Sequence, residues 1–280
     1  WSSDVCSSDL GKFDAIASWW VNPYGHSNTY IADAIYKQLT TLEHVLFGGF
    51  THEPAVVLAE KLMAILPKNQ QKLFFSDNGS TAVEVAIKVA LQYFFNKGEK
   101  KTTIIAFENA FHGDTFAAMA ASGISFFTDA FQGMFIDVIR IPVPVVGQEE
   151  VSFNALAKAL KIHHCAGFIY EPLVQGAAGM VMYEPAALDT LIRMCKENKV
   201  LTIADEVMTG FGKTGKTFAS DYLVEQPDMM CLSKALTGGT IPMAITTFTQ
   251  PIFDTFYDED INKALFHGHT FTANPTGCAA

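Results

Sequence analysis

The stretch that decides the fold is residues 200–206, which read Val-Leu-Thr-Ile-Ala-Asp-Glu. A run of apolar and β-branched residues followed by two carboxylates is typical of a buried strand that ends at Asp205. A second such stretch, residues 229–234, reads Met-Met-Cys-Leu-Ser-Lys and ends at Lys234. In an open α/β sheet, ligands bind beyond the carboxyl ends of the strands, so we expect both charges to face one crevice.

A lysine and an aspartate that converge at one crevice suit pyridoxal phosphate (PLP). The amine of Lys234 would form a Schiff base with the cofactor, and the carboxylate of Asp205 would keep the pyridine nitrogen protonated. The alternative is an ordinary surface lysine and a helix-capping aspartate, which the pair taken alone does not exclude. The residues at the neighbouring strand ends favour the cofactor site.

Helical and strand patterns alternate along the chain from about residue 52. Strands are predicted at residues 72–75, 103–107, 138–141, 166–170, 200–204, 229–233 and 243–248. Helices are predicted at residues 54–66, 81–95, 154–162 and 186–198, with irregular excursions at 123–133 and 142–150. The alternation predicts an α/β fold with a mainly parallel sheet and helices on both faces.

The composition argues against nucleic-acid and membrane partners. The formal net charge is −10, with few basic clusters. No apolar run approaches the roughly 18–20 residues that span a bilayer. The cysteines form no CxxC pair and are expected to be reduced thiols of a cytoplasmic protein: Cys6, Cys165, Cys195, Cys231 and Cys278.

A turn of small polar residues follows the first predicted strand. Residues 76–81 read Ser-Asp-Asn-Gly-Ser-Thr and lead directly into a predicted helix. The N-terminus of a helix offers free backbone N–H groups and the positive end of its dipole to a phosphate. Gly79 would let the backbone approach closely and Ser80 would add a donor, with an ordinary helix cap as the alternative.

The next two strand ends also carry polar or aromatic residues. Residues 111–115 read Phe-His-Gly-Asp-Thr, and Phe111 is the candidate for stacking on a planar cofactor ring, with a core phenylalanine as the alternative. His112 is either a base or a hydrogen-bonded structural histidine. Glu171 ends the strand at 166–170. Functional residues at successive strand ends are what an open α/β enzyme needs.

Residues 267–275, which read His-Gly-His-Thr-Phe-Thr-Ala-Asn-Pro, precede another predicted helix start. His267 and His269 have no third ligand in a zinc-binding pattern, so no metal site is predicted. Thr270 is the candidate for contact with an anion.

Residues 205–215 and 233–239 resemble the signature of the class III PLP-dependent aminotransferases. Within that class, the chain is most similar to the branch that passes an amino group from S-adenosylmethionine to 8-amino-7-oxononanoate in biotin biosynthesis, giving 7,8-diaminononanoate. Other similar stretches are residues 18–20, 47–54, 76–88, 112–116, 171–180 and 267–275. The resemblance covers roughly residues 13–280 and implies the type I fold of PLP-dependent transferases.

The resemblance implies roles for five residues around the cofactor. Lys234 would be the Schiff-base lysine and the proton shuttle, and Asp205 would pair with the pyridinium. Phe111 would stack on the ring, while Gly79 and Ser80 would hold the phosphate.

The resemblance also implies a homodimer with active sites at the interface. Thr270 would then reach the phosphate of the neighbouring subunit's cofactor, and Asp114 would support the site. Substrate contacts are expected from four residues: Trp19, Trp20, Phe111 and Gly239.

Two positions depart from the pattern of the family. Phe111 stands where the family has tyrosine, which removes a hydroxyl near the substrate. Lys213 stands where the family has arginine, which removes a fork-shaped donor. Both changes leave the amino donor open between S-adenosylmethionine and lysine.

Three domain-level expectations follow. Residues 1–10 have no amphipathic period and are interpreted as a non-native leader, 11–51 as an N-terminal segment, and 52–280 as a large PLP-binding domain without the family's small C-terminal domain. The alternative functions are another class III ω-aminotransferase, acting on ornithine, 4-aminobutyrate or β-alanine, and a non-catalytic fragment of this fold. Residues 19–20 and 47–54 disfavour the first, and the intact pair of Lys234 and Asp205 disfavours the second.

Overall fold

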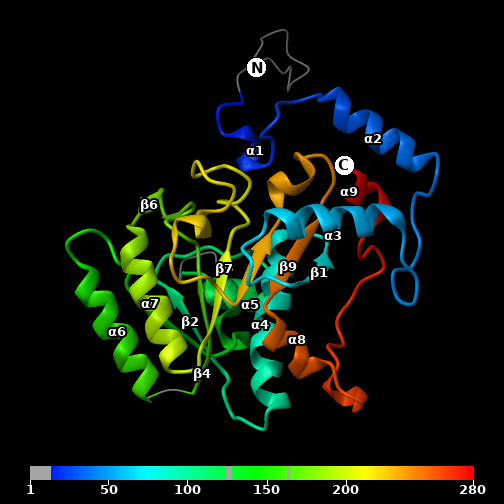
Figure 1. Cartoon of the computed structure of the whole chain (residues 1–280). Helices are drawn as coiled ribbons and strands as arrows, with labels where there is room; N and C mark the ends of the chain where they lie inside the picture. Colours follow the sequence, from blue (N-terminus) through cyan, green and yellow to red (C-terminus); the bar gives the residue numbers. More distant parts are fainter. Residues whose placement is uncertain (1–13, 124–127, 163) are drawn as a thin grey trace.

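The computed structural model describes residues 14–123, 128–162 and 164–280, and its centre is a seven-stranded sheet (Figure 1). The strands lie in the order β1 (Lys72–Ser76), β9 (Ala244–Phe248), β8 (Met229–Leu232), β7 (Leu201–Asp205), β4 (Cys165–Tyr170), β2 (Thr103–Phe107) and β3 (Val138–Ile141). Neighbouring strands run parallel except where β9 pairs with β1 and β8. The predicted α/β fold with a mainly parallel sheet is therefore confirmed.

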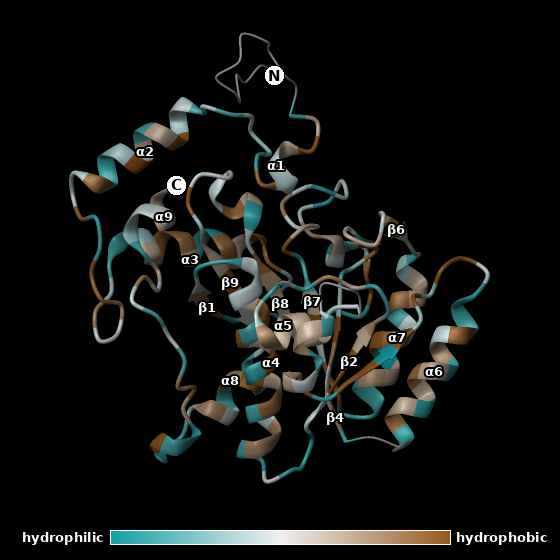
Figure 2. Cartoon of the chain, turned by 180° about the vertical axis from the view of Figure 1, so that it is seen from behind, coloured by the Kyte–Doolittle hydropathy of each residue, from teal (hydrophilic) through white to brown (hydrophobic). Residues whose placement is uncertain are grey.

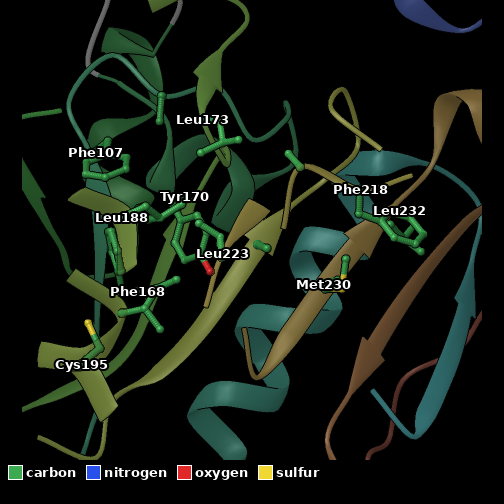
Figure 3. Close-up of a cluster of buried hydrophobic side chains, with 14 of the residues drawn as sticks. Phe107, Phe168, Tyr170, Leu173, Leu188, Cys195, Phe218, Leu223, Met230 and Leu232 are labelled. Atoms are coloured by element: carbon green, nitrogen blue, oxygen red, sulfur yellow. The ribbon is translucent and has the colours of Figure 1, made fainter. Parts of the chain in front are cut away.

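Successive side chains of a strand point to opposite faces of the sheet, so the strands contribute to two separate hydrophobic cores, one on each face. On one face, Ile203 packs in the cluster that includes α4 (Gly79–Asn96) and α5 (Phe116–Ala121). On the other face, Tyr170 packs in the cluster that includes α3 (Glu53–Ile65), α6 (Glu149–Ile162) and α7 (Pro185–Glu197). Figure 3 shows Phe168 and Tyr170 of this second core close to Leu188 of α7, and Figure 2 shows the apolar strands enclosed by the helices. Helices thus cover both faces, as predicted.

Most predicted helices are found where the pattern places them. The predictions at 54–66, 81–95 and 186–198 correspond to α3 (Glu53–Ile65), α4 and α7 (Pro185–Glu197). Helix α6 (Glu149–Ile162) begins at Glu149 rather than at residue 154. The interpretation of 142–150 as irregular was therefore wrong at its end, because two glutamates in the first turn stabilise a helix N-terminus.

Several short elements were not predicted from the sequence. They are helices α1 (Ala17–Trp20), α2 (Thr29–Leu39) and α8 (Gln250–Phe256), and the hairpin of β5 (Val174–Gln175) and β6 (Val181–Met182). The helix start predicted after residues 267–275 is found as α9 (Pro275–Ala279). The excursion at 123–133 falls partly outside the described residues and continues into a 3-10 helix, Asp129–Met134. The expected leader at 1–10 also lies outside them.

The described part of the N-terminal segment, residues 14–51, adds no strand to the seven-stranded sheet. Helix α2 packs on α9, and the side chain of Trp20 lies beside Lys234. Figures 1 and 2 both show α2 standing away from the sheet. None of the helices in the described part of the chain is long and apolar enough to cross a membrane.

Candidate active site

Asp205 and Lys234 lie at the same edge of the sheet. Asp205 ends β7, which pairs in parallel with β8, and Lys234 opens the 3-10 helix η3 (Lys234–Thr237) just beyond β8. Burial lowers the pKa of the Lys234 amine, the negative charges of Asp205 and Glu171 oppose that shift, and the charge of Lys213 adds to it. These four charged groups are therefore close enough to influence one another electrostatically. For Lys234 and Asp205, this agrees with the prediction from the strand ends.

The carboxylate of Asp205 is held on both oxygens. His112 Nδ1 lies 2.7 Å from Asp205 Oδ2, and the backbone N–H of Val207 donates to Oδ1 over 3.1 Å. Both side chains of the Asp205–His112 pair are almost completely buried. Because an ionised carboxylate only accepts hydrogen bonds, Nδ1 carries the proton and orients the aspartate. This hydrogen bond is the one that a structural role of His112 requires.

A cradle of small residues lies at the N-terminus of α4. The first backbone N–H groups of a helix have no partner within it, and those of Gly79 and Ser80 open α4. A Cβ on Gly79 would lie 2.7 Å from Val207 Cγ1, and one on Gly113 would lie 2.1 Å from Ser80 Oγ. Only glycine fits at these two positions without a shift of its neighbours, and the free N–H groups of Gly79 and Ser80 are what an anionic group would meet.

We expect Gly79→Ala to weaken PLP binding. The added methyl group would overlap Val207, and overpacking costs about 1–3 kcal/mol, or roughly a five- to hundredfold rise in the dissociation constant if the strain falls on the bound state. Absorbance titration with PLP measures this, and Gly133→Ala is the control because a Cβ there meets no atom within 4 Å. Equal affinities in the two variants would show that the cradle does not hold the phosphate.

Glu171 joins two loops beside Asp205. Its carboxylate accepts from the backbone N–H of Phe111 over 3.1 Å and from that of Gly176 over 3.0 Å. Burial raises the pKa of Glu171, the charge of His112 lowers it and that of Asp205 raises it. Glu171 thereby fixes the backbone of Phe111, whose side chain stays 45% exposed and free to meet a ligand.

The N-terminal segment covers the turn that carries Lys234. The ring centroid of Trp20 lies 4.9 Å from Lys234 Nζ, whereas Trp19 is 72% exposed. A Cβ on Gly239 would lie 2.0 Å from Asn22 Oδ1. The structure therefore brings Trp20 and Gly239 to the site and leaves Trp19 on the surface of the chain.

The remaining candidates lie at the surface. Thr270, Asp114 and Lys213 are exposed, and the backbone N–H of Asp114 donates to Ser80 Oγ over 3.3 Å. Within the described ranges, no group of three or more His, Cys, Asp or Glu residues is placed to hold a metal ion.

Two residues of the site were missed by sequence reasoning. Val207 packs against Gly79, and Glu206 accepts hydrogen bonds from the backbone N–H groups of Ala219 and Ser220. Burial raises the pKa of Glu206. Their position directly after Asp205, at a strand end, is the signal that could have indicated both.

The chain is similar in sequence and in structure to known aminotransferases. Residues 10–280 match the family model described as aminotransferase class-III. Adenosylmethionine-8-amino-7-oxononanoate aminotransferase of Synechococcus elongatus is 48% identical over 275 residues, which cover 95% of this chain and 65% of that protein. The solved structure of the protein of that name from Methanocaldococcus jannaschii matches with a TM-score of 0.91 at 37% identity, covering 96% of this chain and 63% of that one.

A second solved structure, the ω-transaminase of Pseudomonas jessenii in complex with PMP, matches with a TM-score of 0.88 at 30% identity. The match covers 96% of this chain and 63% of that one. This chain therefore spans less than two thirds of the length of the relatives that it matches.

Proposed function

Because this chain belongs to the class-III aminotransferases, a family of PLP-dependent enzymes, we propose that the whole protein transfers an amino group from S-adenosylmethionine to 8-amino-7-oxononanoate in biotin biosynthesis. The observation that carries the proposal is that the partly buried amine of Lys234 and the buried Asp205–His112 pair lie at the ends of two adjacent parallel strands and interact electrostatically. The names of the relatives support the choice of substrates.

The residues present fit the family's cofactor. Each oxygen of Asp205 accepts one hydrogen bond and can accept another from a protonated ring nitrogen. The glycine cradle suits a phosphate at the N-terminus of α4, with Ser80 Oγ as a further donor. Phe111 can stack on the ring from the loop that Glu171 fixes. When bound, PLP supplies an electron sink for negative charge that develops on a substrate carbon.

Lys234 is the proposed carrier of the proton. A base works best when its pKa lies near the working pH, and burial lowers the pKa of Lys234 from the ordinary lysine value. Its Nζ can therefore take a proton from the substrate carbon and return it to a neighbouring position. Asp205 keeps the negative charge that favours a protonated ring nitrogen.

We further propose that the protein acts as a homodimer in the cytoplasm. Phe271 is 61% exposed next to Thr270, and Tyr30 is 82% exposed on α2. Large apolar side chains of this kind suit a subunit interface, where Thr270 could reach the partner's cofactor. The described cysteines are free and buried, which suits a reducing compartment.

We also propose a division of the chain into two parts. Residues 11–51 would form an N-terminal segment, and residues 52–280 would form the cofactor-binding domain.

The test is amino transfer by the full-length protein. Incubation with PLP should produce a visible absorption band, and addition of S-adenosylmethionine and 8-amino-7-oxononanoate should yield 7,8-diaminononanoate by mass spectrometry. A protein that shows the band but forms no such product would have a different substrate. A protein without the band would not be a PLP enzyme.

Phe111 and Lys213 also keep lysine open as the amino donor. Phe111 offers no hydroxyl, and Lys213 close to Lys234 cannot pair with a carboxylate through two parallel hydrogen bonds. Lysine is therefore the second candidate donor, with the same acceptor.

We expect Phe111→Tyr to improve turnover with S-adenosylmethionine more than with lysine. A regained hydrogen bond is worth about 0.5–1.5 kcal/mol, or roughly a two- to tenfold change in the donor ratio. Half-reaction kinetics with each donor measure it, and Phe116→Tyr, on another exposed ring, is the matched control. An unchanged ratio would mean that Phe111 only stacks and that other residues select the donor.

A further inference from the structure

The four residues 17–20, which end at Trp20, form a left-handed turn. The φ angles are 49° at Ala17, 49° at Ser18, 62° at Trp19 and 68° at Trp20. L-residues other than glycine avoid this region because Cβ approaches the following carbonyl oxygen. Four such residues in a row persist only where the surroundings impose the conformation.

Asp14 accepts side-chain and backbone hydrogen bonds at the start of this turn. Its Oδ1 accepts from the backbone N–H of Ser18 over 2.9 Å, and its Oδ2 accepts from Ser18 Oγ over 2.6 Å and from His26 Nε2 over 2.7 Å. Hydrogen bonds from Ser18, followed by that from His26, lower the pKa of Asp14 to about 2, so the carboxylate is charged at neutral pH. The turn is therefore tied at its start by a charged acceptor.

His26 extends the same network toward the lysine turn. Its Nδ1 lies 3.3 Å from Asn22 Nδ2, which donates, so Nε2 carries the proton given to Asp14. Asn22 in turn lies against Gly239, where a Cβ would be 2.0 Å from Asn22 Oδ1. The network thus runs from Asp14 to the loop that follows Lys234.

The far end of the turn meets Lys234 itself. The ring centroid of Trp20 lies 4.9 Å from Lys234 Nζ, a distance at which an aromatic face attracts an ammonium group. Lys234 also has a positive φ of 49°, so the ring and the amine are both presented by strained backbone. If the turn relaxed to a right-handed conformation, the direction of the Trp20 side chain would change and the ring would leave the amine.

We propose that Asp14 is a positioning residue for Lys234, which together with Ser18 and His26 holds the left-handed turn that keeps the Trp20 ring against the amine. The proposal rests on the proposed function, because it takes Lys234 as the reacting amine. Asp14 does not touch Lys234, and it acts through the turn. The ring would limit access of solvent and of misplaced donors to Nζ.

The test is the rate at which an acylating reagent modifies Lys234 in the full-length protein without cofactor, followed by peptide mass spectrometry. Asp14→Ala and Trp20→Ala are each expected to raise the rate several-fold. Asp33→Asn is the matched control, because Asp33 is an exposed acid of the same segment. Lys101 is the internal reference, since its Nζ donates to the carbonyls of Asn198 and Lys199.

Faster labelling of Lys234 with unchanged labelling of Lys101 supports the proposal, because the opening is then local. If Asp14→Ala speeds the labelling of both lysines, the whole fold has loosened. The milder variant Ser18→Ala, which removes only one hydroxyl donor to Asp14, then tests the proposal in its place. Unchanged Lys234 labelling in Ser18→Ala or in a folded Asp14→Ala would overturn the proposal, as would unchanged labelling in Trp20→Ala.

A kinetic readout separates positioning from plain structural support. In an active full-length protein, Asp14→Ala is expected to raise KM for the amino donor by a larger factor than it lowers kcat, whereas a fall in kcat alone would contradict the proposal. The labelling needs neither PLP nor turnover. A protein that fails to transaminate but shows the expected labelling would therefore refute the proposed function and leave the Asp14 proposal standing.

Discussion

Replacing Lys234 with arginine is expected to abolish amino transfer by the full-length protein. Arginine keeps the positive charge, but its guanidinium is not deprotonated in proteins and cannot act as a base or as an amine nucleophile. Loss of a positioned acid–base group alone costs about 10²–10⁴ in rate, and loss of the covalent link to PLP adds to that. Product formation, followed by mass spectrometry over long incubation, is the measurement.

A mapping experiment accompanies that variant. Borohydride reduction of the PLP-loaded protein should attach the cofactor to Lys234 and to no other lysine, because burial lowers the pKa of this amine. Lys216→Arg is the matched control, since Lys216 is exposed and donates to the carbonyl oxygen of Asp221. A label on another lysine, or normal turnover in Lys234→Arg, would contradict the assignment.

The sequence was sufficient to predict the sheet and the convergence of Asp205 with Lys234. Strand periodicity is local, and the carboxyl ends of parallel strands meet at one edge whatever their order. The contact between His112 and Asp205 joins residues 93 positions apart in the chain, and it depends on the strand order and on the loop after β2. That geometry is not encoded by periodicity, so the two roles of His112 could not be separated from sequence.

The N-terminal segment was the least predictable part of the site. Residues 17–20 read Ala-Ser-Trp-Trp and contain no glycine, so nothing local indicates a positive φ at each of them. We attribute the turn to the hydrogen bonds that Ser18 donates to Asp14, and the contact with the loop at Gly239 is made by the residues that follow the turn, Val21 and Asn22. Resemblance to a family suggested both tryptophans as substrate contacts, but the structure places only Trp20 beside Lys234.

The last expected result concerns the charge on Asp205. Asp205→Asn retains one oxygen that can accept from His112 Nδ1, while its NH2 group can no longer accept from the Val207 N–H, so the buried pair is kept and the negative charge is lost. Without that charge, protonation of the ring nitrogen is no longer favoured and the ring withdraws electrons less effectively. We expect amino transfer to fall by several factors of ten, each about 1.4 kcal/mol of transition-state stabilisation, while part of the PLP binding remains.

The matched control for this variant is Asp228→Asn. Asp228 accepts from the backbone N–H and the hydroxyl of Thr202, at the opposite end of the strands that present Asp205 and Lys234. Burial raises the pKa of Asp228, so its replacement should alter stability and leave the rate per cofactor-loaded site nearly unchanged. Single-turnover absorbance kinetics, normalised to bound PLP, compare the rates of the two variants.

Similar rates in both variants would mean that the Asp205 carboxylate supports the fold rather than the reaction. A large loss confined to Asp205→Asn would mean that its charge acts on the ring.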